Sequence, residues 1–134
     1  MFDLSLAPCT SQALGMEDGT IAKNQITSSG HINTNFRPKY ARLNLPSDYS
    51  SGQSIGSYGA WCTDTNEKWI QVAFDAQVSL AGVMMQARDV YRTYEFWVSQ
   101  YWVEHSVDGT QWHYVMDAKQ EAMVNMYKVL DAFL

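Results

Sequence analysis

The chain has 134 residues, within the usual size of one folded domain, and its 46% apolar and 17% charged content excludes a disordered tail. A net charge of −5 disfavours attraction of the whole surface to nucleic acid, which requires a cationic face. No apolar run reaches the roughly 18 residues of a membrane-spanning helix, and residues 1–8 lack the basic start of a signal peptide. We therefore expect any secretion signal to be absent from this sequence.

The first part of the chain predicts loops followed by strands. Residues 47–59 are rich in Ser, Gly and Tyr, which indicates a long exposed loop. The clearest strand is expected over residues 69–74, where apolar side chains alternate with a period of two. A second apolar segment covers residues 78–86. The alternating positions of the first strand are Ile70, Val72 and Phe74.

The second part of the chain predicts a β-hairpin. A strand is expected over residues 97–107, and Asp108-Gly109 supplies turn residues before a further apolar strand at 112–116. These two strands should pair antiparallel. The side chains expected to face inward are Trp97, Tyr101, Val103 and Val107.

These elements favour an all-β domain, an antiparallel β-sandwich, because short strands alternate with polar loops and no convincing helix precedes residue 117. The abundance of Trp, Tyr and Phe agrees with that class. Residues 118–134 have apolar positions near a helical period and could instead form an amphipathic helix. The sequence leaves both structures open for this tail.

Short motifs occur in a fixed order over residues 9–117. They begin with Cys9 and include Leu14-Gly15-Met16-Glu17-Asp18-Gly19, Ala41-Arg42-Leu43-Asn44, Gly59-Ala60-Trp61, Trp69-Ile70-Gln71-Val72, Gln86-Ala87-Arg88 and Ser106-Val107-Asp108-Gly109-Thr110. This series resembles the discoidin domains, also called coagulation factor 5/8 C-type domains. The resemblance implies one domain over residues 1–134, folded as a distorted jelly roll of antiparallel strands. It fades after Asp117, which predicts a truncated or divergent C-terminal end.

The resemblance also implies a function. Discoidin domains are non-catalytic, extracellular modules of secreted proteins or of the ectodomains of larger ones, and they bind ligands through protruding loops. By position these loops are residues 30–39, 48–58 and 88–96. We expect a protein or matrix ligand there and no nucleic acid. The candidate binding residues are Ile32, Asn33, Phe36, Arg37, Lys39, Tyr58, Arg88 and Arg92. The alternative is that the aromatic side chains pack beneath the loops and the arginines are solvated.

Two other ligand classes follow from the same family. Anionic phospholipid binding would require a basic ring, formed by Arg37, Lys39, Arg42, Arg88 and Arg92, around Ile32 and Phe36. Glycan binding would require a polar trio beside an aromatic ring, for which Asn33, Asn35 and Tyr58 are candidates.

The two cysteines, Cys9 and Cys62, could pair with each other, stay reduced or have partners outside this chain. In the family, the first cysteine usually bonds the last, and the Gly59-Ala60-Trp61-Cys62 motif resembles one in discoidin receptors whose cysteine pairs near the C-terminus. The resemblance therefore implies that both cysteines have lost their usual partners.

Catalytic and metal chemistry has little support in the sequence. His31, His105 and His113 accompany no nucleophile elbow, phosphate loop or zinc motif, so no enzyme and no cofactor are expected. His105 and His113 straddle the Asp108-Gly109 turn and could face each other as two metal ligands, although a core or partly buried position is favoured for His105. Glu17 and Asp18 are weak calcium candidates or solvated loop charges.

Overall fold

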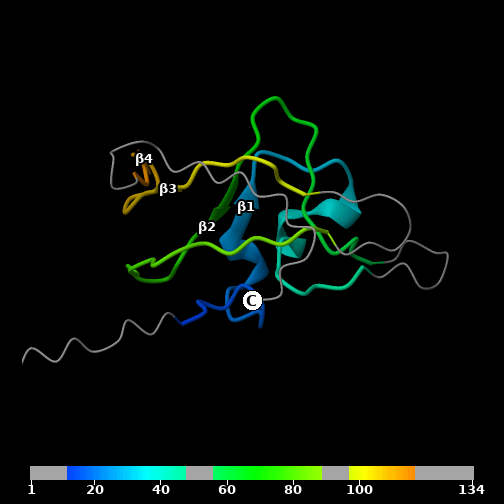
Figure 1. Ribbon diagram of the computed structural model, residues 1–134, viewed down its shortest axis with the longest axis horizontal. Helices are drawn as coiled ribbons and strands as arrows, with labels where there is room; N and C mark the ends of the chain where they lie inside the picture. Colours follow the sequence, from blue (N-terminus) through cyan, green and yellow to red (C-terminus); the bar gives the residue numbers. More distant parts are fainter. Residues whose placement is uncertain (1–11, 48–55, 89–96, 117–134) are drawn as a thin grey trace, which may run out of the picture.

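The computed structural model describes residues 12–47, 56–88 and 97–116 (Figure 1). Regular structure in these ranges consists of three short 3-10 helices and four short strands, which form two separate antiparallel sheets. These residues contain no α-helix, and therefore none long and apolar enough to span a membrane. The described structure is consistent with the predicted all-β class. Residues 118–134, for which the sequence left both a helix and part of the sandwich open, lie outside the described residues.

The first sheet joins two distant parts of the chain. The 3-10 helix η1 (Lys23–Gln25) leads directly into β1 (Ile26–Ser28), which pairs with β2 (Ile70–Val72) near the middle of the molecule (Figure 1). The backbone N–H of Ser29 donates to the Trp69 carbonyl at 3.0 Å beyond one end of the pairing. The strand expected at residues 69–74 is thus confirmed over its centre, whereas β1 was not predicted.

A small apolar core lies where the N-terminal turn meets β1. Ile21 and Ile26 are the buried apolar side chains of the described residues, with 4% and 3% of their surfaces exposed. A backbone hydrogen bond from the Ile21 N–H to the Gly15 carbonyl closes the preceding turn, and the Asp18 carboxylate accepts from the Thr20 N–H. The turn thereby directs Ile21 inward beside β1.

Arg42 links this N-terminal turn to the loop that follows β1. Its guanidinium donates to the carbonyls of Met16 and Ile21, both at 2.7 Å, and to the Lys39 carbonyl at 3.2 Å. Two segments that make no strand pairing with each other are therefore linked by one half-buried side chain.

The second sheet is the predicted hairpin. β3 (Glu104–His105) pairs with β4 (His113–Tyr114), and Val115 extends the ladder with a 2.8 Å hydrogen bond to the Val103 carbonyl. In the turn, one carboxylate oxygen of Asp108 accepts the backbone N–H groups of Thr110 and Gln111 at 2.8 and 2.9 Å. Gly109 follows with φ of 72°, the left-handed conformation for which glycine is suited.

Several predicted strands are shorter than expected. Regular pairing in the segment 97–107 is confined to β3, and Val107 is 82% exposed because it lies at the turn, so its predicted inward orientation is wrong. The apolar segment at residues 78–86 forms no strand ladder.

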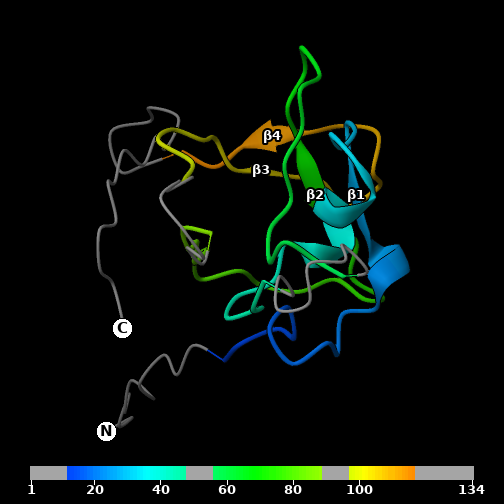
Figure 2. The same ribbon diagram turned by 90° about the vertical axis from the view of Figure 1, so that its right-hand side faces the viewer.

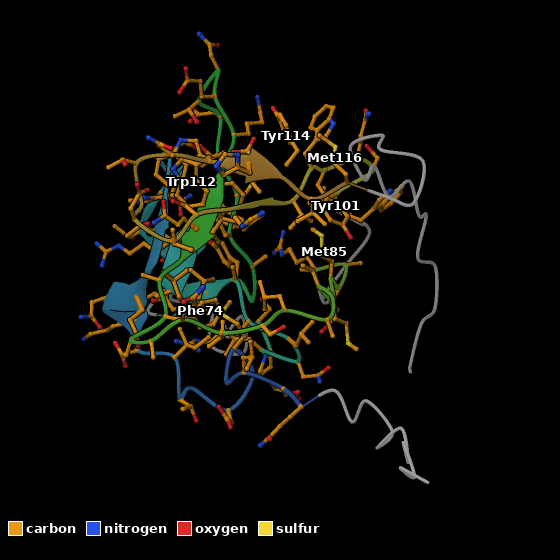
Figure 3. The ribbon with its side chains drawn as sticks, turned by 90° about the vertical axis from the view of Figure 1, so that its left-hand side faces the viewer. Phe74, Met85, Tyr101, Trp112, Tyr114 and Met116 are labelled. Carbon is orange, nitrogen blue, oxygen red and sulfur yellow. The ribbon has the colours of Figure 1, made fainter. Side chains whose placement is uncertain are left out.

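Apolar side chains of these segments stay accessible. Figure 3 places Met85 and Tyr101 between the segments 78–88 and 97–103, with Tyr114 and Met116 on the β4 side. Met85 remains 40% exposed and Met116 51% exposed. The residues before β2 extend outward as the long green loop of Figure 2.

Replacing Arg42 by Ala should lower the free energy of unfolding by about 1–3 kcal/mol, because three backbone carbonyls lose their donor. Urea unfolding followed by tryptophan fluorescence measures the change. The matched control is Arg37→Ala, which removes an exposed arginine and should change stability by less than about 0.5 kcal/mol. Equal effects of the two substitutions would contradict the linking role of Arg42.

The hairpin should lose stability in acid. Hydrogen bonds from the backbone of Gln111 and then of Thr110 hold the pKa of Asp108 well below its ordinary value of 3.8. A carboxyl whose pKa is lower when folded stabilises the fold above the unfolded pKa, and this stabilisation disappears as the pH falls through the folded pKa. The thermal midpoint should therefore fall less steeply below about pH 4 in Asp108→Asn than in the parent. Asp64→Asn, which alters an exposed loop elsewhere, should behave as the parent does.

Candidate functional site

The first predicted loop is built from two consecutive 3-10 helices, η2 (Thr34–Phe36) and η3 (Pro38–Tyr40). The side chain of Asn33 caps η2 by accepting from the Asn35 N–H at 2.9 Å. Pro38 begins η3 with a backbone angle that the ring already fixes. Local hydrogen bonds and proline therefore give this loop a defined shape.

Three predicted site residues from three loops lie together. The Phe36 and Tyr58 rings are 4.9 Å apart, and the Arg88 guanidinium lies 5.4 Å from the Phe36 centroid and 5.3 Å from the Tyr58 centroid. These are distances at which a cation is attracted to an aromatic face. We call Phe36, Tyr58 and Arg88 the Arg88 cluster. All three side chains are half-buried.

Backbone contacts fix the Arg88 cluster. Arg88 Nε donates to the Tyr58 carbonyl at 3.1 Å, and the Tyr58 N–H donates to the Asn35 carbonyl at 3.1 Å. Gly59 follows with φ of 70°, and a Cβ there would meet the Leu45 carbonyl oxygen at 2.6 Å. Only glycine allows the chain to pass so close, which keeps Tyr58 against Phe36.

The segment after Gly59 forms hydrogen bonds with the first loop. The Ile32 N–H donates to the Cys62 carbonyl at 3.0 Å, and the Trp61 indole donates to the Gly30 carbonyl at 2.8 Å. Sequence reasoning did not assign Trp61 a role in the site. The sequence feature that could have indicated this role is the Gly59-Ala60-Trp61 motif, which places an indole donor directly after a tight turn.

The remaining candidates differ in exposure. Ile32 is 48% exposed, and Asn33 and Arg37 are also exposed. Lys39 is half-buried with its ammonium 4.7 Å from the Tyr40 ring centroid. Arg92 and most of the second and third loops lie outside the described residues.

Two expectations about the ligand chemistry change. Arg42 does not belong to a basic ring around Phe36, because its guanidinium serves the carbonyls of Met16, Ile21 and Lys39. The polar trio proposed for glycans is already engaged in part, since the Asn33 side-chain oxygen caps η2 and the Asn35 side-chain oxygen accepts from the Thr34 hydroxyl at 3.4 Å.

The calcium candidates have local partners. Glu17 accepts a hydrogen bond from the Asn44 amide at 2.6 Å, and hydrogen bonds from Thr20 lower the pKa of Asp18. Among the described residues, no three or more His, Cys, Asp or Glu side chains are grouped closely enough to hold a metal ion. In the same ranges Cys62 is a half-buried free thiol, while Cys9 lies outside them.

The histidines of the hairpin differ from expectation. His105 is exposed, so the favoured assignment of a core or partly buried position is wrong, and His113 is exposed as well. They are register partners, as their positions around the turn indicated, and their ring centroids are 5.9 Å apart.

Comparison with known proteins identifies similar sequences. The chain is 39% identical to coagulation factor VIII of Canis lupus familiaris over 101 residues, which is 75% of this chain and 4% of that protein. It is 32% identical to lactadherin of Bos taurus over 112 residues, or 78% of this chain and 24% of that protein. Neuropilin-1 of Xenopus laevis is 25% identical over 119 residues, which cover 84% of this chain and 11% of that protein. The chain thus spans a small part of each relative. No solved structure gives a significant match.

The family comparison extends the motif resemblance. The model of the F5/8 type C domain matches residues 25–132, beyond Asp117 where the recognisable motifs end. Domains of this family are extracellular ligand-binding modules without catalytic activity, which confirms the expectation that this chain is not an enzyme. This chain belongs to the F5/8 type C, or discoidin, domain family.

Proposed function

We propose that the chain is an extracellular recognition and adhesion module that binds a protein or matrix ligand through the face built on residues 30–40, Tyr58 and Arg88. The Arg88 cluster carries this proposal, because it joins three loops through one aromatic pair and one guanidinium. Side chains that are already held in position lose less conformational entropy when they bind.

The cluster would act as the floor of the site and the first loop as its rim. Aromatic and arginine side chains dominate the energetically important parts of protein interfaces because they bury large areas with few rotatable bonds. Ile32, Asn33 and Arg37 are the exposed candidates next to this floor, and they offer apolar, amide and cationic contacts. Such a mixture suits a protein surface better than a hydrocarbon phase.

We also propose that residues 1–134 form one domain with the antiparallel sandwich of the family, in a secreted protein or the ectodomain of a larger one. Two antiparallel sheets and loops that converge on one cluster support this architecture. The small fraction of each relative that the chain spans supports a module within a larger protein.

Anionic phospholipid is the second candidate ligand, favoured by the exposure of Ile32 beside Arg37. An apolar tip with nearby cations can insert between acidic headgroups. Against it, Arg42 is used within the fold, and the chain carries a net charge of −5. A glycan is the third candidate.

Ile32→Ala should weaken binding by roughly 5- to 30-fold, because an apolar contact at the rim is worth about 1–2 kcal/mol when an interface buries it. The matched control is Leu80→Ala, since Leu80 is 49% exposed, almost the same as Ile32, but lies outside the loop face. Binding of the fluorescent domain to intact cells and to deposited extracellular matrix gives the measurement. Equal loss in the two variants would remove the site from this face.

The same binding assay distinguishes between the three ligand classes. Loss of binding after trypsin treatment supports a protein ligand, and loss after glycosidase treatment alone supports a glycan. Sedimentation with phosphatidylserine vesicles, with calcium present or chelated, tests the lipid. Vesicle binding that falls with salt and disappears in Phe36→Ala would replace our proposal with a membrane-docking function.

A further inference from the structure

One face of the β3–β4 hairpin carries two histidines in direct opposition. His105 and His113 are register partners, both side chains are exposed, and the ring centroids are 5.9 Å apart with 41° between the ring planes. Directly opposite residues of antiparallel strands project to the same face of a sheet. The two imidazoles are therefore presented together to solvent.

The neighbours of the pair on this face are uncharged. Because side chains alternate along a strand, the next residues on this face, away from the turn, are Val103 beside His105 and Val115 beside His113. Glu104, paired with Tyr114, projects to the opposite face. The donor set offered here is thus imidazole nitrogen without carboxylate, which favours zinc, copper or nickel over calcium or magnesium.

The spacing is compatible with one shared ion. Two imidazole nitrogens bound to zinc at about 2.0–2.1 Å place the ring centres roughly 5 Å apart. The observed 5.9 Å is close to that value, and exposed side chains can close the difference by small torsional changes. Strand pairing fixes the two backbone positions, so little ordering is needed to bring both rings to a metal.

We infer that His105 and His113 form a cross-strand chelate for a borderline divalent cation such as Zn²⁺ or Cu²⁺. The described residues add no third His, Cys, Asp or Glu to this pair, so water completes the coordination shell and leaves it accessible to an external ligand. This site is separate from the Arg88 cluster and does not depend on the proposed recognition function. Bound metal would also tie β3 to β4 at the positions nearest the turn.

Zinc titration of the untagged chain, with its thiols alkylated, tests the site by isothermal calorimetry. The parent should bind one equivalent, and His105→Gln and His113→Gln should each weaken binding by at least about tenfold, because the second nitrogen no longer binds at high effective concentration. His31→Gln is the matched control, since it removes an exposed histidine from another loop, and it should bind as the parent does.

A second measurement keeps the test independent of folding defects. Saturating zinc should raise the thermal midpoint of the parent and of His31→Gln, since a ligand that binds the folded state stabilises it. It should raise the midpoint of the two hairpin variants little, while their circular dichroism without metal stays that of the parent. Absence of one-to-one binding in the parent, or unchanged affinity in both hairpin variants, would overturn the assignment.

Discussion

The pairing of β1 with β2 brings together two stretches of chain that the sequence keeps about forty residues apart. Ser29 and Trp69 continue the contact beyond the strands through backbone and hydroxyl hydrogen bonds. Each hydrogen bond contributes only about 1 kcal/mol net. Yet this pairing sets the first loop beside the segment that leads into β2, and the contacts of Trp61 with Gly30 and of Cys62 with Ile32 follow from that placement. Without it, nothing would hold the residues of the proposed binding face in fixed positions relative to one another.

Three arginines perform different tasks in this structure. Arg42 satisfies three carbonyls from two segments and so belongs to the scaffold. Arg88 lies against two aromatic rings and uses its Nε for the Tyr58 carbonyl. Arg37 projects from the first loop and is exposed. The planar fork of arginine donors allows all three uses, and the local supply of carbonyls or aromatic faces decides between them.

Sequence reasoning succeeded where the signal is local. Asp108-Gly109 between apolar runs predicted the hairpin, and the alternation around Ile70 and Val72 predicted β2. β1 has three residues and no alternation of its own, so its pairing is decided by the distant β2. The role of Arg42 was mispredicted for the same reason, since two of its three acceptors lie 21 and 26 positions away. Among the candidate site residues, the grouping of Phe36 with Tyr58 and Arg88 came from the family resemblance, because spacing alone does not place three loops together.

The two sheets also differ in how much chain their formation must order. His105 and His113 are eight positions apart, whereas Ser29 and Trp69 are separated by forty. Closing the longer loop costs roughly 1–2 kcal/mol more entropy, and short hairpins close within microseconds. During folding, the hairpin can therefore form before β1 pairs with β2 and brings the loops of the proposed binding face together. A partly folded chain would then present its histidine pair before the proposed binding face is assembled.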